Sequence, residues 1–133
     1  MTEAELHRSI VKWLRMVHWR IPVIWFSVPN NPRSRVAGQR LKAEGMLSGA
    51  PDLVFLWNAW DKRGGSMPLN ATTAANTLLI ELKRPKSYGT TAGKLSRNQK
   101  TFQAACETAG VPYVIARSID DCERVLKERG LIL

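Results

Sequence analysis

The feature that most constrains this chain is the six-residue stretch 78–83, Leu-Leu-Ile-Glu-Leu-Lys, in which four apolar residues carry two opposite charges. A short apolar run of this kind is typical of a buried β-strand. Side chains alternate between the two faces of a strand, so Glu81 and Lys83 share one face with Leu79. Because an uncompensated charge is costly in an interior, the two residues are either a structural ion pair or groups held there for chemistry.

The rest of the chain predicts one α/β domain. At 133 residues it is long enough for a single hydrophobic core. Apolar periodicity and capping signals predict helices at 2–17, 34–44, 96–109 and from 120 or 121 to 129, and strands at 23–28, 53–57, 77–83 and 113–116. The polar segment 58–76 is predicted to be a hairpin turn or a mobile insertion. This order suggests one central sheet with helices on its faces.

The charge of the chain favours a polyanionic partner. Lysine and arginine number 20 against 11 acidic residues, which gives a formal net charge of +9 and a pI near 10.2. No apolar run of about 18 residues is present, so we do not expect a membrane partner. The candidate nucleic-acid-binding residues fall into two groups, one around the second predicted helix and one at 84–100: Arg33, Arg35, Arg40, Lys42, Arg84, Lys86, Lys94, Arg97 and Lys100. The first group fits a solvated helix face or a phosphate-facing surface.

Two isolated cysteines, Cys106 and Cys122, have no metal-ligand spacing. They fit a reducing, cytoplasmic environment, which is the location that we expect. Cys106 lies among alanines and is expected to be a small core residue rather than a nucleophile.

Two carboxylates can meet at one end of the sheet. Asp52 precedes the strand at 53–57, and Glu81 stands near the end of the strand at 77–83. If these strands are antiparallel neighbours, a hairpin brings both acids together. Mg²⁺ prefers oxygen ligands and is typically bound by one or two carboxylates, waters and a substrate phosphate. Lys83 would then face the metal and its water, where it can orient the water and stabilise negative charge.

The first helix and the last basic segment offer further polar groups. Glu5 forms a capping box with Thr2, whereas Glu3 projects onto the apolar stripe of the helix. Glu3 either completes the metal shell, directly or through water, or faces solvent in the first helical turn. Gln99 is a candidate to hold the water or a phosphate. His7 is expected to be a hydrogen-bonded packing residue.

Each of these signals is weak alone, because Glu-x-Lys and Pro-Asp are frequent by chance. Together, the residues Gly49-Ala50-Pro51-Asp52, Glu81-Leu82-Lys83, Ser96-x-x-Gln99 and Glu3 resemble the Pro-Asp…Asp/Glu-x-Lys nuclease superfamily, PD-(D/E)xK. The chain is most similar to its virus-type replication-repair nuclease branch, the VRR-Nuc domain, over nearly its whole length. That branch includes small stand-alone members in phages.

The resemblance implies a restriction-endonuclease-like core with a mixed four-stranded sheet flanked by helices. It also implies Asp52, Glu81 and Glu3 as ligands of Mg²⁺, with Mn²⁺ as a substitute, Lys83 as the catalytic lysine and Gln99 as a supporting polar residue. The departures are His7, where relatives often have glutamine, and the long 58–76 segment.

The function expected from this resemblance is Mg²⁺-dependent endonucleolytic cleavage of branched DNA, such as Holliday junctions, by a homodimer. If the protein is phage-encoded, its location is the host cytoplasm. Two alternatives stay open from the residues: a linear-duplex endonuclease or nickase, and a basic nucleic-acid-binding module in which Glu81 and Lys83 are only an ion pair.

Overall fold

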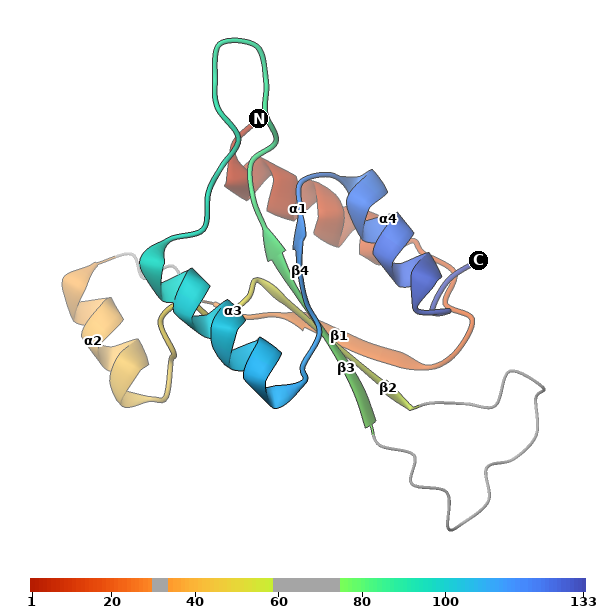
Figure 1. Cartoon of the computed structure of the whole chain (residues 1–133), viewed down its shortest axis with the longest axis horizontal. Helices are drawn as coiled ribbons and strands as arrows, with labels where there is room; N and C mark the ends of the chain where they lie inside the picture. The colour runs from red at the N-terminus through yellow and green to blue at the C-terminus, as the bar shows by residue number, and fades with distance from the viewer. Residues whose placement is uncertain (30–33, 59–74) are drawn as a thin grey trace.

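The structure is a computed structural model of the chain, and it describes residues 1–29, 34–58 and 75–133. The described residues form an α/β fold of four helices and four strands (Figure 1). In chain order these are α1 (Glu3–Leu14), β1 (Val23–Ser27), α2 (Arg35–Ala43), β2 (Leu53–Asn58), β3 (Ala75–Leu82), α3 (Arg97–Ala109), β4 (Tyr113–Ala116) and α4 (Ile119–Glu128).

The four strands form one mixed sheet in the order β1-β2-β3-β4. The first two pairs are antiparallel and the pair β3–β4 is parallel, with α3 as the crossover between its strands. An open mixed sheet flanked by helices is consistent with a restriction-endonuclease-like core, so the predicted fold class is confirmed.

The register of the hairpin between β2 and β3 sets the position of the two acids. Leu53 pairs with Ile80, and continuing this antiparallel register by one residue brings Asp52 opposite Glu81. The predicted pairing of these strands is therefore confirmed. The 58–76 connection falls largely on residues 59–74, outside the described residues, as do Asn30 and Arg33.

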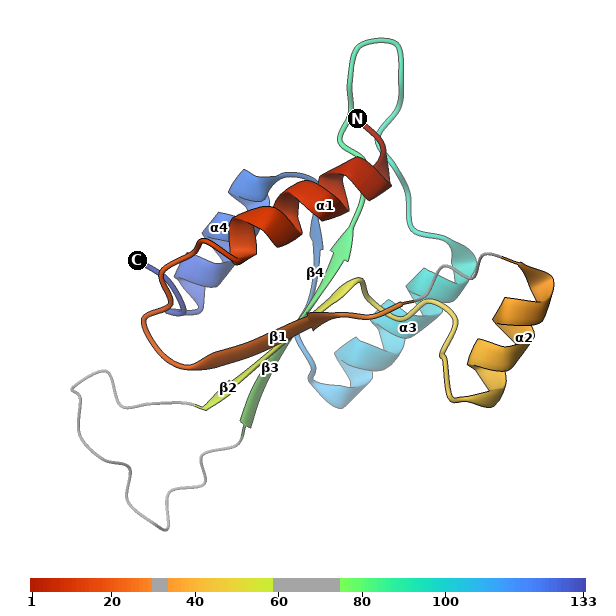
Figure 2. The ribbon, with the colours of Figure 1, turned by 180° about the vertical axis from the view of Figure 1, so that it is seen from behind.

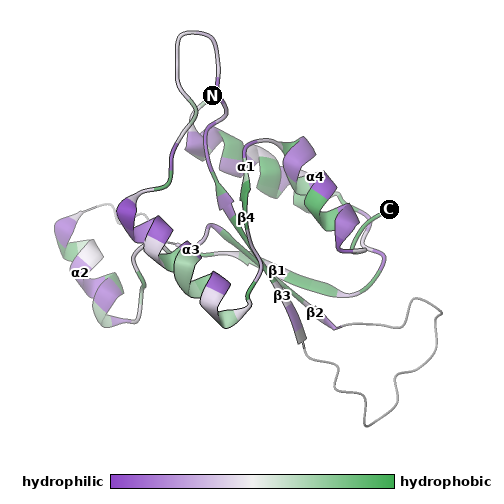
Figure 3. Cartoon of the chain, viewed as in Figure 1, coloured by the Kyte–Doolittle hydropathy of each residue, from purple (hydrophilic) through white to green (hydrophobic). Residues whose placement is uncertain are grey.

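Helices cover both faces of the sheet. Figures 1 and 2 show α1 and α4 together on one face and α3 on the other. The main core lies under α1 and α4, and it includes Leu6, Ile10, Leu14, Leu53, Phe55, Leu78, Ile80, Leu82, Cys122 and Leu126. Figure 3 shows β1 and β4 as largely hydrophobic and the start of α3 as hydrophilic. Along β3, Leu78, Ile80 and Leu82 belong to this core, whereas Glu81 lies on the other face of the strand, as predicted.

Some boundaries differ from the predictions. The first helix ends at Leu14 rather than at Val17, because the Met16 N–H turns back to the Trp13 carbonyl in a tighter turn. The last helix begins at Ile119, with Ser118 as its N-cap, one or two residues before the predicted start at Asp120 or Asp121. Lys83 lies just beyond β3, yet its N–H still donates to the Ala116 carbonyl at 3.0 Å. None of the described helices has the length and apolar character needed to cross a bilayer.

Candidate active site

Asp52 is fixed just before β2, at one end of the two inner strands, by a hydrogen bond from the backbone. The Leu82 N–H donates to Asp52 Oδ2 at 2.7 Å, which joins the start of β2 to the end of β3. The loop before Asp52 depends on Gly49, whose φ is +88°. A Cβ on Gly49 would lie 2.3 Å from the Asn98 carbonyl oxygen, so only glycine lets this loop approach the start of α3 so closely.

Glu81 is the most deeply buried acid in this region. It is 2% exposed. Gln99 Nε2 donates to Glu81 Oε1 at 2.7 Å, while Glu81 Oε2 is buried and accepts no hydrogen bond in the described structure. A buried carboxylate oxygen without a donor is costly unless a proton or a cation occupies that side. Gln99 therefore holds one oxygen of Glu81, and the Asp52 carboxyl lies close enough to Glu81 to share a hydrogen bond when one of the two acids is protonated.

Lys83 lies between two carboxylates. Its Nζ is 3.8 Å from Glu81 Oε1 and 3.7 Å from Glu3 Oε1, and the lysine side chain is 8% exposed. The Glu3 side chain is 48% exposed, so Glu3 reaches the lysine from the solvent side through the first turn of α1. Glu5 instead accepts a hydrogen bond from the Thr2 N–H, which confirms its predicted capping role.

The two neighbouring acids resist ionising together. Burial, followed by the negative charge of Asp52, raises the pKa of Glu81 to about 8, although Lys83 opposes this shift. Burial also raises the pKa of Asp52, against the lowering effect of the Leu82 N–H. A divalent cation between the two carboxylates would remove both penalties.

The residues present fit a hard cation at Asp52 and Glu81. The unpartnered Glu81 Oε2 and the mutual repulsion of the two acids both favour a cation there, and Mg²⁺ needs only one or two protein carboxylates. The predicted set of three acidic ligands is not gathered. No group of three histidine, cysteine or acidic side chains in residues 1–29, 34–58 and 75–133 is arranged to hold a metal. Glu3 contacts Lys83 instead.

Gln99 contacts Glu81 directly, and its predicted role at the water or a phosphate stays a prediction. Its side chain is shared between two partners: Nε2 donates to Glu81, and Oε1 accepts from the Ser96 N–H at 2.8 Å. These contacts make Gln99 a positioning residue for Glu81. Ser96 and Gln99 form a capping box at the start of α3, whereas the contact with Glu81 depends on tertiary structure.

One known protein family matches most of the chain. The VRR-NUC domain family matches residues 4–120, nearly nine-tenths of the chain. The chain belongs to the VRR-NUC family. This membership makes it a nuclease of the PD-(D/E)xK type, with DNA as its implied substrate. The matched span includes Asp52, Glu81 and Lys83, and it begins one residue after Glu3. No curated protein and no solved structure matches the chain.

Most of the predicted nucleic-acid-binding residues lie on the surface. Those that are exposed are Arg35, Arg40, Lys42, Lys86, Lys94, Arg97 and Lys100. Arg40 pairs with Glu44 at 3.0 Å, and the half-buried Arg84 donates to the Thr91 carbonyl at 2.8 Å, so both have partners within the protein. Arg33 lies outside the described residues.

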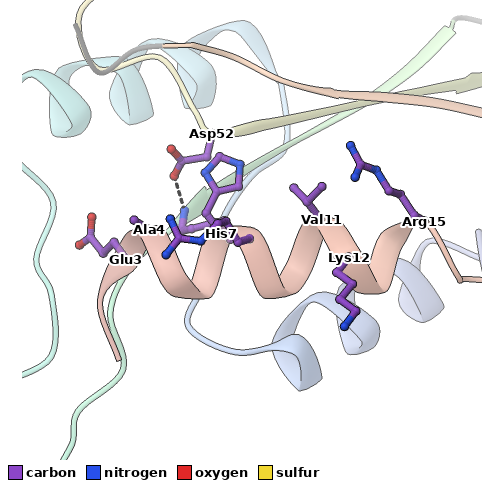
Figure 4. A pocket seen from close by; sticks show the side chains of 9 residues that line it. Glu3, Ala4, His7, Val11, Lys12, Arg15 and Asp52 are labelled. Atoms are coloured by element: carbon purple, nitrogen blue, oxygen red, sulfur yellow. Dashed lines mark hydrogen bonds between the residues drawn. The ribbon is translucent and has the colours of Figure 1, made fainter. Parts of the chain in front are cut away.

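A cavity of about 610 Å³ opens beside Asp52 and follows α1. Figure 4 shows Glu3, His7 and Asp52 around its acidic end. His7 Nε2 lies 3.1 Å from Ser27 Oγ, as expected for a hydrogen-bonded packing residue. The cavity is also lined by Arg8, Lys12 and Arg15, which are not among the predicted nucleic-acid-binding residues. Their helical spacing was visible in the sequence, but their position beside Asp52 was not.

Proposed function

We propose that this protein is a Mg²⁺-dependent endonuclease that hydrolyses phosphodiester bonds in branched DNA, such as four-way junctions. One observation carries the metal-dependent part of this proposal. Asp52 and Glu81 are neighbouring acids that favour a cation, and a buried lysine lies 3.8 Å from Glu81. A structural ion pair alone would not require the second carboxylate beside it.

The residues divide the work of hydrolysis as follows. Asp52 and Glu81 would hold the metal, which supplies Lewis-acid stabilisation and a more acidic water when bound. Lys83 would orient the attacking water and stabilise the negative charge that develops on the phosphate oxygens. Glu3 holds the lysine ammonium from its other side, and Gln99 holds Glu81.

We also propose a homodimer as the active species on junctions. Symmetric cleavage of two strands requires two active sites related by a two-fold axis, which a homodimer supplies directly. Light scattering of the protein alone and with a junction tests this: a mass of two chains supports it, and a single chain that cuts both strands would refute it.

Substrate selectivity is tested with three labelled DNAs: a four-way junction, a flapped duplex and a linear duplex. Each is incubated with wild-type protein in Mg²⁺, Mn²⁺ or EDTA. We expect metal-dependent cleavage, fastest on the junction. Equal cleavage of the linear duplex would favour the linear-duplex endonuclease or nickase. Binding without cleavage of any substrate would favour the non-catalytic binding module.

A further inference from the structure

The cavity beside Asp52 has a strongly asymmetric charge distribution. Its acidic lining residues, Glu3 and Asp52, lie at the end next to the first turns of α1. Arg8, Lys12 and Arg15 line the remainder, and we call these three residues the cationic row. Figure 4 shows Arg15 on the same side of α1 as His7 and Asp52, with Lys12 leaving the helix on the other side.

The cationic row is not held by ion pairs among the described residues, although the pKa of the Glu5 carboxyl one turn away, lowered chiefly by its hydrogen bonds with Thr2, is lowered further by the charge of Arg8. All three side chains are exposed, and none makes an ion pair in the part of the chain that the structure describes. Solvated lysines and arginines are common on helix surfaces. These three differ because they line one cavity with the candidate metal ligand Asp52.

The spacing of the row suits a nucleic-acid strand. Arg8, Lys12 and Arg15 are four and three residues apart, which brings them to neighbouring positions along a helix. At 1.5 Å per residue the row is roughly 10 Å long. Three cations can neutralise up to about three phosphates, so the row suits a short stretch of one strand.

We propose that the cationic row binds the backbone of the cleaved DNA strand on one side of the scissile phosphate, across about three nucleotides. This inference rests on the proposed nuclease function and adds the path of the substrate to it. The scissile phosphate would lie at the Asp52 end, and the strand would run along α1. The other exposed cations, on α2 and near the start of α3, remain for the rest of the DNA.

The first test compares two triple variants with the same loss of charge. Arg8→Gln/Lys12→Gln/Arg15→Gln removes the row. Arg20→Gln/Lys127→Gln/Arg129→Gln removes three exposed cations that do not line the cavity. Affinity for a fluorescent four-way junction is measured by anisotropy in EDTA over a range of salt, after thermal melts establish that both variants fold.

Each lost phosphate contact should lower the slope of log affinity against log salt by about one. We therefore expect the row variant to lose about two to three units of slope and roughly tenfold or more in affinity at low salt. The control should stay within about one unit of wild type. Equal slopes for the row variant and wild type, or equal losses in both variants, would overturn the proposal.

The second test establishes that the row contacts one side only. After the cut is mapped on the wild-type protein, neutral methylphosphonates replace three phosphates on either side of it. We expect replacement on one side of the cut to weaken DNA binding by the wild-type protein but not by the row variant. Replacement on the other side should weaken DNA binding by both proteins. Losses that add independently on both sides would contradict a one-sided path.

Failure of the nuclease proposal is distinguishable from failure of this one. A wild-type protein that binds the junction in EDTA but never cleaves it in Mg²⁺ refutes the proposed nuclease function. The salt slopes then still test DNA binding by the cationic row. A wild-type protein that cleaves, with a row variant of unchanged slope, refutes the row alone. A wild-type protein that does not bind DNA refutes both.

Discussion

Gln99 donates a hydrogen bond from Nε2 to Glu81 Oε1 at 2.7 Å, and this contact ties the first turn of α3 to the end of β3. The same side chain accepts a hydrogen bond from the Ser96 N–H, so one residue both caps a helix and orients a buried acid. Removing the cap and removing the carboxylate contact should therefore have separable effects.

We expect Gln99→Leu to lower kcat/KM by about 10- to 100-fold, because a group that orients a metal ligand typically matters to that degree. Ser96→Ala is the matched control: it removes the capping hydroxyl and should cost about 1 kcal/mol of stability with little loss of activity. Steady-state cleavage over a range of Mg²⁺ measures both. Similar activity losses in the two variants would show that Gln99 acts only through the helix cap.

The two glutamates at the start of α1 should behave differently. Glu3 lies 3.7 Å from the buried Lys83 ammonium, whereas Glu5 caps the helix at the surface. We expect Glu3→Gln to lower the cleavage rate about tenfold or more, since Lys83 loses the acid on its solvent side. Glu5→Gln should stay near wild type, because glutamine also serves in a capping box. Equal rates in the two variants would contradict a role for Glu3 at the lysine.

The pKa of about 8 at Glu81 has a consequence for stability. An unfolded glutamate ionises near pH 4.5, so the folded metal-free protein binds more protons than the unfolded chain between about pH 4.5 and 8. Stability should therefore fall as pH rises through this interval. Because the cation replaces the proton, the thermal shift produced by Mg²⁺ should be larger at pH 8.5 than at pH 6.

Thermal melts in EDTA from pH 5 to 9 measure this effect. Glu81→Gln should flatten the pH profile, since the amide does not titrate. Glu107→Gln changes an exposed acid on α3 and should leave the profile unchanged. A wild-type profile in the Glu81→Gln protein would show that Glu81 is not the group responsible.

Two glycines with positive φ, Gly45 and Gly49, allow the cost of backbone strain to be distinguished from the cost of a steric overlap. Gly45 has φ +100° and open space around it, whereas a Cβ on Gly49 would overlap the Asn98 carbonyl. We expect Gly45→Ala to cost about 1 kcal/mol and to keep its activity. Gly49→Ala should cost about 3 kcal/mol and lower activity, because its loop leads into Asp52. Urea unfolding and cleavage rates measure both, and equal effects would contradict the close approach.

Much of the fold was predictable from local sequence. The alternation at 78–83 separates the core residues Leu78, Ile80 and Leu82 from Glu81. The antiparallel pairing of β2 with β3 joins two apolar strands that are consecutive in the chain. Helix ends were less predictable. The first helix stops at Leu14 although Val17 continues the apolar stripe, because tertiary packing determines where the chain turns.

The site was predictable in its members but not in all of its contacts. Spacing suggested that Asp52, Glu81 and Lys83 would converge, and they do. It did not indicate that Glu3 would contact the lysine rather than join a cluster of three acids, since that depends on how α1 sits on the sheet. The bond from the Leu82 N–H to Asp52 is made by the backbone, which has no residue signature.

The most direct test of the central claim is the single-turnover rate of four-way-junction cleavage in Mg²⁺ by wild type, Glu81→Gln and the control Glu107→Gln. Glu81→Gln keeps the shape of the buried side chain and removes its charge. We expect it to lose at least about 100-fold in rate, with junction binding in EDTA unchanged and Glu107→Gln equal to wild type. A Glu81→Gln protein that cleaves at the wild-type rate would contradict metal-dependent hydrolysis at this site.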